Sequence, residues 1–392
     1  MDCGWWRDAG AADHRTVQPR RLPSFSGRVR DPRPRPEAPD PRHRRVKFAA
    51  TRRRSRGVAR ARTVISLVGA LGAVACATPP DARIAADGTL LASEAFCIRT
   101  PYDEQSELTR FRFPREVYER AANDPRLVST RITYACDGLR ITGVLVQPRE
   151  TPSYPLPTIL YCRGGTADFG ALDESDLVTF HEWANLGFVV LASNYRGGGG
   201  SDGVDTWCGD DVHDVLALVP LARSFPAVDA DNLFLVGLSR GGPMVYGALR
   251  DGIRVRAAAV MAGVSDLMAE DMLEREPEFA DGDDDVFRAM GWRGWRSVWP
   301  DYDHRAEEHK RARSATCWPE KLRVPLLLLH AKDDPRVPVA HSERLAAALQ
   351  RIGAPHELVL YDHDGHSLPL HREDRDQRIA AWFRRHLAPV QH

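Results

Sequence analysis

Six short apolar runs between residues 158 and 361 constrain the fold of this 392-residue chain more than any other feature. The runs are 158–162, 188–193, 233–236, 257–261, 324–330 and 357–361. Each is four to seven residues long and is followed by a helical or glycine-rich stretch. Strands that are apolar on both faces are typical of a parallel sheet covered by helices. The pattern therefore predicts an α/β protein.

Two further β-rich runs, 128–135 and 141–146, come first and flank Cys136-Asp-Gly138. An Asp-Gly pair between two such runs predicts a hairpin. Helices are expected at 173–186, 210–224, 241–251, 341–352 and 374–387. An antiparallel N-terminal hairpin followed by alternating strands and helices is the order of the α/β-hydrolase fold. That fold has a mostly parallel central sheet with helices on both faces.

Residues 266–320 interrupt this alternation with acidic and tryptophan-rich sequence. We expect them to form a small irregular cap over the carboxyl edge of the sheet. The tryptophans Trp292, Trp295 and Trp299 either line an apolar subsite or form the core of this cap.

The expected parts of the chain are a disordered Arg/Pro-rich tail (1–62), a signal peptide (63–76), a linker and N-terminal extension (77–126) and the α/β-hydrolase domain (127–392).

The charges are divided unevenly between the tail and the rest of the chain. Residues 1–62 carry 18 of the 54 Lys and Arg residues and 6 of the 54 Asp and Glu residues. The remaining residues carry 36 basic against 48 acidic side chains. An acidic body does not favour a polyanionic partner, so we expect no nucleic acid to bind it.

An export signal is predicted in front of Cys76. Two arginines, Arg60 and Arg62, precede a mostly apolar stretch at 64–75 that is too short to span a bilayer. A basic start, a short apolar centre and small residues at the end are the parts of a secretory signal peptide. Ala73-Val-Ala-Cys76 also resembles a bacterial lipoprotein cleavage box, with Ala73 where Leu is usual. This implies a secreted protein, or a lipoprotein of the bacterial cell envelope attached to the membrane through a lipidated Cys76.

The signal begins near residue 58 rather than at Met1. Our hypothesis is that residues 1 to about 57 are an over-long translation and that the chain starts at Val58 or Val46. The alternatives are that the apolar stretch is an anchor or a linker, or that the basic tail is a nucleic-acid-binding arm.

The seven cysteines form no Cys-x-x-Cys pair and show no Cys/His spacing typical of zinc, so no metal site is predicted. Without Cys3 and Cys76, five cysteines remain. This odd number leaves at least one thiol free, and it leaves one or two disulfides open. The oligomeric state is open as well.

The sequence Gly237-Leu-Ser239-Arg-Gly241 directly follows the run 233–236 and opens an expected helix. Strand, tight turn and helix are the context that a nucleophilic serine of this kind requires. The turn exposes the Ser239 hydroxyl. It also directs the next backbone N–H, that of Arg240, toward the position of a developing oxyanion. Ser239 is therefore the candidate nucleophile.

A serine nucleophile needs a base, and the base needs a carboxylate that holds it in one tautomer. In this fold the chain order is serine, acid, histidine. Asp333 and Asp334 follow the run 324–330. The sequence Asp362-His-Asp-Gly-His366 follows the run 357–361. Both segments lie at the carboxyl ends of predicted strands, where the acid and the base belong.

Residues from about 128 to 388 resemble the catalytic domain of the prolyl oligopeptidase family of serine peptidases. The segments that carry the resemblance are Phe188-Val-Val-Leu-Ala-Ser-Asn-Tyr-Arg-Gly197, Gly237-Leu-Ser-Arg-Gly-Gly242, His330-x-x-x-Asp334-x-x-Val-Pro338 and Gly365-His366. In that family the catalytic Asp stands four residues after the histidine at the strand end, and the catalytic His follows a glycine. The match implies Asp334 as the acid and His366 as the base. Asp333 and His363 are their rivals, and His330 is expected to close the turn.

A second oxyanion donor is expected in Tyr161-Cys-Arg-Gly-Gly165, which resembles the family's aromatic-Gly-Gly segment. Either a backbone N–H of this segment, such as that of Gly164, or the Arg163 side chain would provide it. Relatives often carry Tyr where Arg163 stands, so the identity of this donor is open. Arg240 and Ala331 also depart from the usual Tyr and Gly, but no reacting group is lost.

The four glycines at 197–200 lack the Gly-Lys-Ser/Thr ending of a phosphate loop, so no nucleotide site is predicted. The neighbouring charged residues are interpreted as interior ion-pair or capping residues. They are Arg196, Asp210, Asp211 and Asp214.

Together these residues predict hydrolysis by acyl transfer, in which Ser239 attacks a carbonyl and water later releases the acyl group. The resemblance favours a peptidase that acts on short peptides, and it implies no metal or organic cofactor. Roughly 50 residues separate Cys76 from the hairpin, too few for the propeller domain that many relatives carry. The alternatives are a carboxylesterase or acyl hydrolase on the same scaffold, and a surface lipoprotein that has lost activity.

Overall fold

The computed structural model describes residues 85–274, 276–282, 288 and 293–389. The expectations for the tail, the signal peptide, Cys76 and Trp292 lie outside the described residues. None of the described helices combines the length and the apolar character needed to cross a lipid bilayer.

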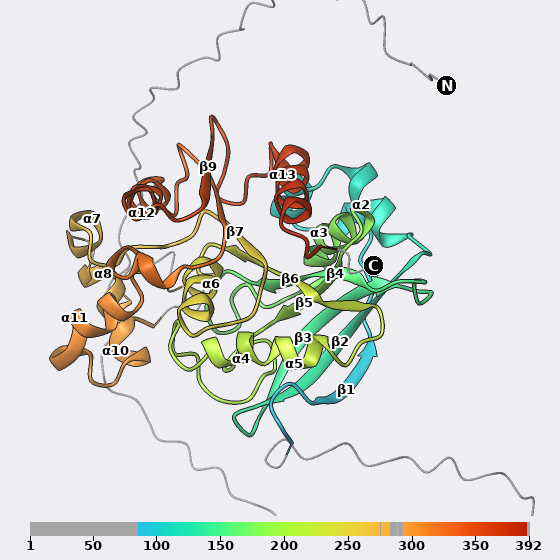
Figure 1. The fold of residues 1–392 in the computed structure, drawn as a ribbon, viewed down its shortest axis with the longest axis horizontal. Coiled ribbons are helices and arrows are strands. Elements are labelled where there is room, and N and C mark those ends of the chain that lie inside the picture. Colours follow the sequence, from blue (N-terminus) through green and yellow to red (C-terminus); the bar gives the residue numbers. More distant parts are fainter. Residues whose placement is uncertain (1–84, 275, 283–287, 289–292, 390–392) are drawn as a thin grey trace, which may run out of the picture. The chain divides into compact units, whose positions relative to one another are not determined.

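One mixed sheet of nine strands runs through the described part of the chain (Figure 1). The strands are β1 Leu90–Ala95, β2 Leu127–Cys136, β3 Leu139–Pro148, β4 Leu156–Cys162, β5 Val189–Ser193, β6 Val228–Leu238, β7 Ala257–Met261, β8 Leu326–Ala331 and β9 His356–Tyr361. Their order is β1-β2-β3-β5-β4-β6-β7-β8-β9. The pairs up to β3–β5 are antiparallel, and the pairs from β5–β4 to β8–β9 are parallel. This confirms the predicted α/β-hydrolase arrangement.

The predicted N-terminal hairpin is formed by β2 and β3. Their ladder ends at the pair Cys136–Leu139, so that Asp137 and Gly138 make the turn. Both turn residues have positive φ, 51° and 74°. Two residues of this conformation match the twist of the flanking strands, and Gly adopts it without steric cost.

Helices cover both faces of the sheet (Figure 1). α3 Glu174–Asn185 and α13 Arg372–Arg385 pack on one face, and α4 Val212–Leu216, α5 Leu218–Ala222, α6 Gly241–Arg250 and α12 Ala340–Arg351 pack on the other. Successive residues of β4 point to opposite faces. Ile159 and Tyr161 belong to the core under α3 and α13, whereas Leu160 and Cys162 belong to the core under α6. This double burial explains why the central strands are apolar throughout.

The segment before the hairpin contains elements that the sequence analysis did not predict. They are β1, η1 Tyr102–Glu104, α1 Glu107–Arg112 and α2 Arg115–Ala122. β1 is an edge strand paired with β2, and α2 packs on α3. β1 is mostly exposed and α2 has only eight residues. Neither therefore contains the apolar run by which the central elements could be recognised.

The region between β7 and β8, where the cap is expected, consists of short helices. They are α7 Glu270–Glu274, α8 Glu276–Asp281, α10 Trp295–Val298, α11 Tyr302–Ala312, η2 Ala315–Cys317 and η3 Pro319–Lys321. Trp295 and Trp299 are buried, and their rings stack with centroids 5.3 Å apart. They pack with Leu267, Met272 and Tyr302. Of the two roles considered for these tryptophans, the structure supports the core of the cap.

The cysteines of the described residues are free thiols. They are Cys97, Cys136, Cys162, Cys208 and Cys317. The disulfides that the sequence left open are therefore not formed within this set.

Candidate active site

Ser239 lies at the tight turn between β6 and α6. Its φ of +58° is uncommon for a residue with a side chain. Its backbone N–H donates to the carbonyl of Met261 at 2.9 Å, and its own carbonyl accepts from the N–H of Gly242 at 2.9 Å. These bonds hold the strained turn at the carboxyl end of β6.

Gly237 and Gly241 allow the strand and the helix to meet at this turn. A Cβ at position 241 would overlap the carbonyl oxygen of Cys162 in β4, and a Cβ at position 237 would overlap the carbonyl of Gly241. The start of α6 can therefore approach β4 only because residue 241 has no side chain.

Asp334 and His366 meet in the loops that follow β8 and β9. His366 Nδ1 lies 2.8 Å from Asp334 Oδ2, so the ring N–H donates to the carboxylate. The Asp334 side chain is fully buried, and its Oδ1 accepts the backbone N–H groups of Arg336 and Val337. Burial alone would raise the pKa of Asp334, but hydrogen bonds from His330 and His366 hold that pKa well below its ordinary value. An ionised Asp334 leaves His366 Nε2 available to accept a proton.

His330 closes the turn that carries Asp334. Its buried ring places Nε2 2.9 Å from the carbonyl oxygen of Val337 and 3.3 Å from Asp334 Oδ2. Its Nδ1 lies 2.7 Å from the hydroxyl of Ser342. A histidine that is bonded through both ring nitrogens supports the turn, which agrees with the structural role expected for it.

The rival residues Asp333 and His363 lie at the surface. The His363 side chain is 95% exposed and that of Asp333 is 53% exposed, with 3.6 Å between His363 Nδ1 and Asp333 Oδ2. Water screens a pair of this kind. The geometry therefore favours Asp334 and His366, the pair implied by the family match.

Asp364 orders the loop that carries His366, and the sequence analysis did not single it out. Its buried carboxylate accepts the backbone N–H groups of Gly365, Leu370 and His371, and it lies 2.8 Å from His371 Nδ1. Aspartate side chains often bind nearby backbone N–H groups in loops. The sequence around Asp364 therefore permits this role but does not single out Asp364 from its aspartate neighbour.

Gly164 lies beside the Ser239 hydroxyl. A Cβ at this glycine would lie 3.2 Å from Ser239 Cβ and 3.8 Å from Ser239 Oγ. Within the described residues, no group accepts a hydrogen bond from the backbone N–H of Gly164 or of Arg240. Both N–H groups are therefore available to an oxyanion. Among the described residues, no hydrogen bond joins the Ser239 hydroxyl to His366. In hydrolases the distance between the nucleophile and its base is often long before substrate binds.

The Arg163 side chain is not an oxyanion donor, which corrects one of the two alternatives considered for that residue. Its guanidinium donates five hydrogen bonds of 2.7 to 3.1 Å to the backbone carbonyls of Asn194, Gly164, Phe169 and Ala167. These bonds use all of its donors. Arg163 instead supports the 163–170 loop from within.

The Arg240 side chain is buried in an ion-pair network. Its Nη1 and Nη2 each lie 2.7 Å from an oxygen of Asp205, and Nη2 also binds Asp211. Nη1 donates to the carbonyl of Gly165 at 3.1 Å. The network joins the Ser239 turn to the 163–170 loop. The sequence indicated a role for the Arg240 backbone but not the pairing of its side chain with Asp205, because partners about 30 residues apart form no local pattern.

Arg196 and Asp214 form the expected interior ion pair, with 2.7 Å between Nη2 and Oδ1, whereas Asp210 is exposed. Of the glycines that follow Arg196, Gly198 packs against the 163–170 loop, whereas Gly197 packs against the backbone of Val204 and Asp205. A Cβ at Gly198 would overlap the backbone of this loop. The glycine run thus serves close packing of two loops.

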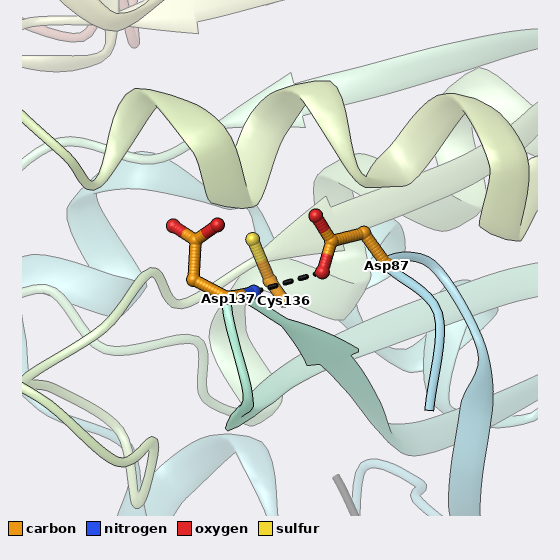
Figure 2. Close-up of side chains that lie close together, drawn as sticks. All are labelled: Asp87, Cys136 and Asp137. Carbon is orange, nitrogen blue, oxygen red and sulfur yellow. Dashed lines mark hydrogen bonds between the residues drawn. The ribbon is translucent and has the colours of Figure 1, made fainter. Parts of the chain in front are cut away.

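A separate polar cluster at the β2–β3 turn consists of Asp87, Cys136 and Asp137 (Figure 2). Their ligand-type atoms lie within 4.8 Å of one another. However, Asp137 Oδ2 lies 2.8 Å from both Arg196 Nη2 and His213 Nδ1, and Asp87 accepts the Asp137 N–H at 2.8 Å. Burial raises the pKa of the Cys136 thiol, which disfavours the thiolate that a metal would require. The cluster is explained by closure of the hairpin.

Comparisons with known sequences find a family and relatives that this chain resembles. The sequence profile of the prolyl oligopeptidase family matches residues 175–389. The uncharacterized peptidase YtmA of Bacillus subtilis is 29% identical over 255 residues, which cover 64% of this chain and 92% of YtmA. Dipeptidyl-peptidase 5 of Porphyromonas gingivalis is 27% identical over 236 residues, which cover 58% of this chain but only 33% of that relative.

Solved structures share the fold. An acylaminoacyl peptidase in complex with Z-Gly-Gly-Phe-chloromethyl ketone matches with a TM-score of 0.53 and 21% identity, over 68% of this chain and 43% of the other. An acetyl xylan esterase from Paenibacillus sp. R4 matches with a TM-score of 0.50 and 19% identity, over 66% of this chain and 85% of the other. Peptidases and an esterase therefore share this scaffold.

Proposed function

Because the chain belongs to the prolyl oligopeptidase family of serine-type peptidases, we propose that Ser239, His366 and Asp334 form its catalytic triad and that it cleaves short peptides. The observation that carries the proposal is the hydrogen bond between His366 and the buried carboxylate of Asp334. The pair follows β8 and β9, and the Ser239 turn follows β6 in the same parallel part of the sheet. The carboxyl ends of such strands meet at one edge, where ligands of α/β proteins bind.

In the proposed mechanism, Ser239 Oγ attacks the scissile carbonyl carbon while His366 Nε2 accepts the hydroxyl proton. Asp334 stabilises the resulting imidazolium. The backbone N–H groups of Arg240 and Gly164 bind the negative charge on the carbonyl oxygen. His366 then protonates the leaving amine, and a water molecule activated by the same histidine hydrolyses the acyl-enzyme.

The preference for peptides is supported by a relative that the match covers over nearly its whole length. YtmA, covered over 92% of its length, is named a peptidase. The alternative is a carboxylesterase, because the acetyl xylan esterase shares the fold over 85% of its length. The same triad can serve both reactions, so fold does not decide the substrate.

The test compares turnover of aminoacyl and peptidyl p-nitroanilides with turnover of short-chain p-nitrophenyl esters, in the wild type and in Ser239→Ala. We expect the wild type to cleave anilides and the variant to be slower by at least about 10⁴-fold, with an unchanged unfolding curve. Ser239-dependent cleavage of esters alone would indicate a carboxylesterase. Near-wild-type activity of Ser239→Ala would refute the assigned nucleophile, and turnover of neither substrate would favour a lipoprotein that has lost activity.

A further inference from the structure

Asp205 lies at the meeting point of the Ser239 turn, the 163–170 loop and the segment that contacts the cap. Its buried carboxylate accepts five hydrogen bonds. The donors are the hydroxyl of Thr166 at 3.0 Å, the N–H groups of Ala167 and Trp207 at 2.8 Å each, and Nη1 and Nη2 of Arg240 at 2.7 Å each. A carboxylate offers about four lone-pair sites, so this one is fully used.

On one side, Asp205 holds the 163–170 loop. Its Oδ2 binds both Thr166 and Ala167, and it shares Arg240 Nη1 with the carbonyl of Gly165. The loop is therefore bonded, through one carboxylate, to the residue that follows Ser239.

On the other side, the residues directly after Asp205 are held by the cap region. The carbonyl of Thr206 accepts from Trp299 Nε1 at 3.0 Å and from Arg313 Nη2 at 3.2 Å. The carbonyl of Trp207 accepts from Arg313 Nε at 2.7 Å. The Trp207 ring also meets that of Trp299 edge-on, with centroids 6.4 Å apart. The core of the cap thus extends to the segment that carries Asp205.

The backbone at this junction is strained. Trp207 and Cys208 both have positive φ, 49° and 67°. Their N–H groups donate to Asp205 Oδ1 at 2.8 Å and to Asp211 Oδ2 at 3.0 Å. Strain of this kind persists where surrounding contacts impose it, and it is frequent at functional sites. Here the two carboxylates that bind Arg240 impose it.

We propose that Asp205 is a positioning residue that couples the cap to the 163–170 loop and thereby fixes the second oxyanion donor beside Ser239. This rests on the proposed function, because the loop has that role only if Ser239 is the nucleophile. Asp205 acts through Arg240 and the backbone of Ala167 rather than on the reacting atoms. Its loss therefore affects kcat more than KM.

Asp205→Asn tests the coupling with p-nitrophenyl acetate, a substrate too small to depend on a cap subsite. The amide offers one acceptor oxygen instead of two, so it cannot hold both the 163–170 loop and Trp207, while Asp211 still pairs with Arg240. We expect kcat to fall by about 10- to 100-fold with KM little changed, because even a small displacement of an oxyanion donor from its position beside Ser239 slows the reaction strongly. Thr166→Val removes one donor only and should give a smaller fall.

Asp202→Asn is the matched control. It makes the same chemical change three residues earlier in the chain, in an exposed pair with Arg140, and it should retain the wild-type kcat.

The cap side is tested by Arg313→Lys, because an ammonium cannot bind the carbonyls of Thr206 and Trp207 in the planar geometry of a guanidinium. We expect kcat toward the same small ester to fall, although Arg313 makes no hydrogen bond to Asp205. If the two residues act through one path, the fall in the double variant Asp205→Asn/Arg313→Lys will be smaller than the product of the single effects.

Thermal unfolding and fluorophosphonate labelling of Ser239 are measured for every variant. A folded Asp205→Asn protein with wild-type kcat would overturn the coupling, whereas Ser239-dependent activity of the wild type would leave the proposed function standing. If Asp205→Asn does not fold, Thr166→Val and Arg313→Lys decide, and unchanged kcat in both overturns the coupling. A wild type that neither turns over substrate nor is labelled at Ser239 would overturn the proposed function and the coupling together.

Discussion

Asp333 and Asp334 are neighbours in the chain but differ in burial and in partners. The Asp334 side chain is fully buried and bonded to His366, whereas that of Asp333 is 53% exposed. Either carboxylate has the chemistry of a triad acid. Burial makes the difference, because a carboxylate shielded from water holds an imidazolium more strongly than one that water screens.

Asp334→Asn should lower kcat by about 10⁴-fold, because an amide neither stabilises the imidazolium nor selects the required tautomer. Asp333→Asn is the matched control and should stay near the wild type. Steady-state kinetics on the best wild-type substrate, with thermal unfolding as a check on folding, measure both. Equal losses in the two variants would contradict Asp334 as the acid.

At the scale of elements, the Ser239 turn depends on the close contact between α6 and β4. Gly241→Ala should lower the free energy of unfolding by about 3 kcal/mol, because its Cβ would overlap the rigid carbonyl of Cys162. Gly252→Ala is the control, since position 252 has a φ of +85° and no atom within 4 Å of an added Cβ. Its cost is limited to the left-handed backbone, about 1 kcal/mol. Urea unfolding compares them, and equal costs would argue against the packing explanation.

Strands that are buried on both faces of the sheet are among the elements that the sequence predicted. All five residues of β5 and of β7 are buried, so an uninterrupted apolar run identifies each strand. β1 has a single buried residue among its six, and such an edge strand forms only because β2 offers it a free row of backbone groups. The predicted helix at 210–224 is observed as α4 and α5.

At the scale of the whole molecule, buried histidines link stability to pH. His341 in α12 is buried, and its Nδ1 accepts the backbone N–H groups of Ser265 and Asp266 at 3.3 Å each. It thereby ties the start of the cap to α12. Burial, assisted by the positive charge of Arg344, lowers the pKa of His341 to about 3.

The unfolded chain binds a proton at this histidine below a pH of about 6.5, whereas the folded chain does not until a pH of about 3. The contribution of the neutral His341 to the stability of the folded protein is therefore fully present above about pH 6.5, and it is lost progressively as the pH falls below that value. We expect the wild-type Tm to fall between about pH 7 and pH 5, and His341→Gln to show a smaller fall from a lower starting Tm. Burial also lowers the pKa of His181, so we expect His341→Gln to keep part of the dependence of Tm on pH. Parallel Tm curves would contradict the role of His341.

The sequence by itself determined the chain order of the strands from β2 to β9, the main helices between them and the turn that carries Ser239. Burial of a strand on both faces, helical periodicity and the residues of a tight turn are all features of short segments. They can therefore be recognised from residues that are neighbours in the sequence. The segments that follow β8 and β9 could also be located, and the family resemblance named Asp334 and His366 within them.

Only the tertiary structure decided which groups surround these residues. Arg163 turned out to bind four backbone carbonyls, and Arg240 to pair with Asp205 and Asp211. These partners lie on different loops, and their contacts depend on how the loops pack at the edge of the sheet. A buried charge is stable only when it is paired, and its partner can lie far away in the sequence. The residues around the charge therefore do not indicate which partner it has.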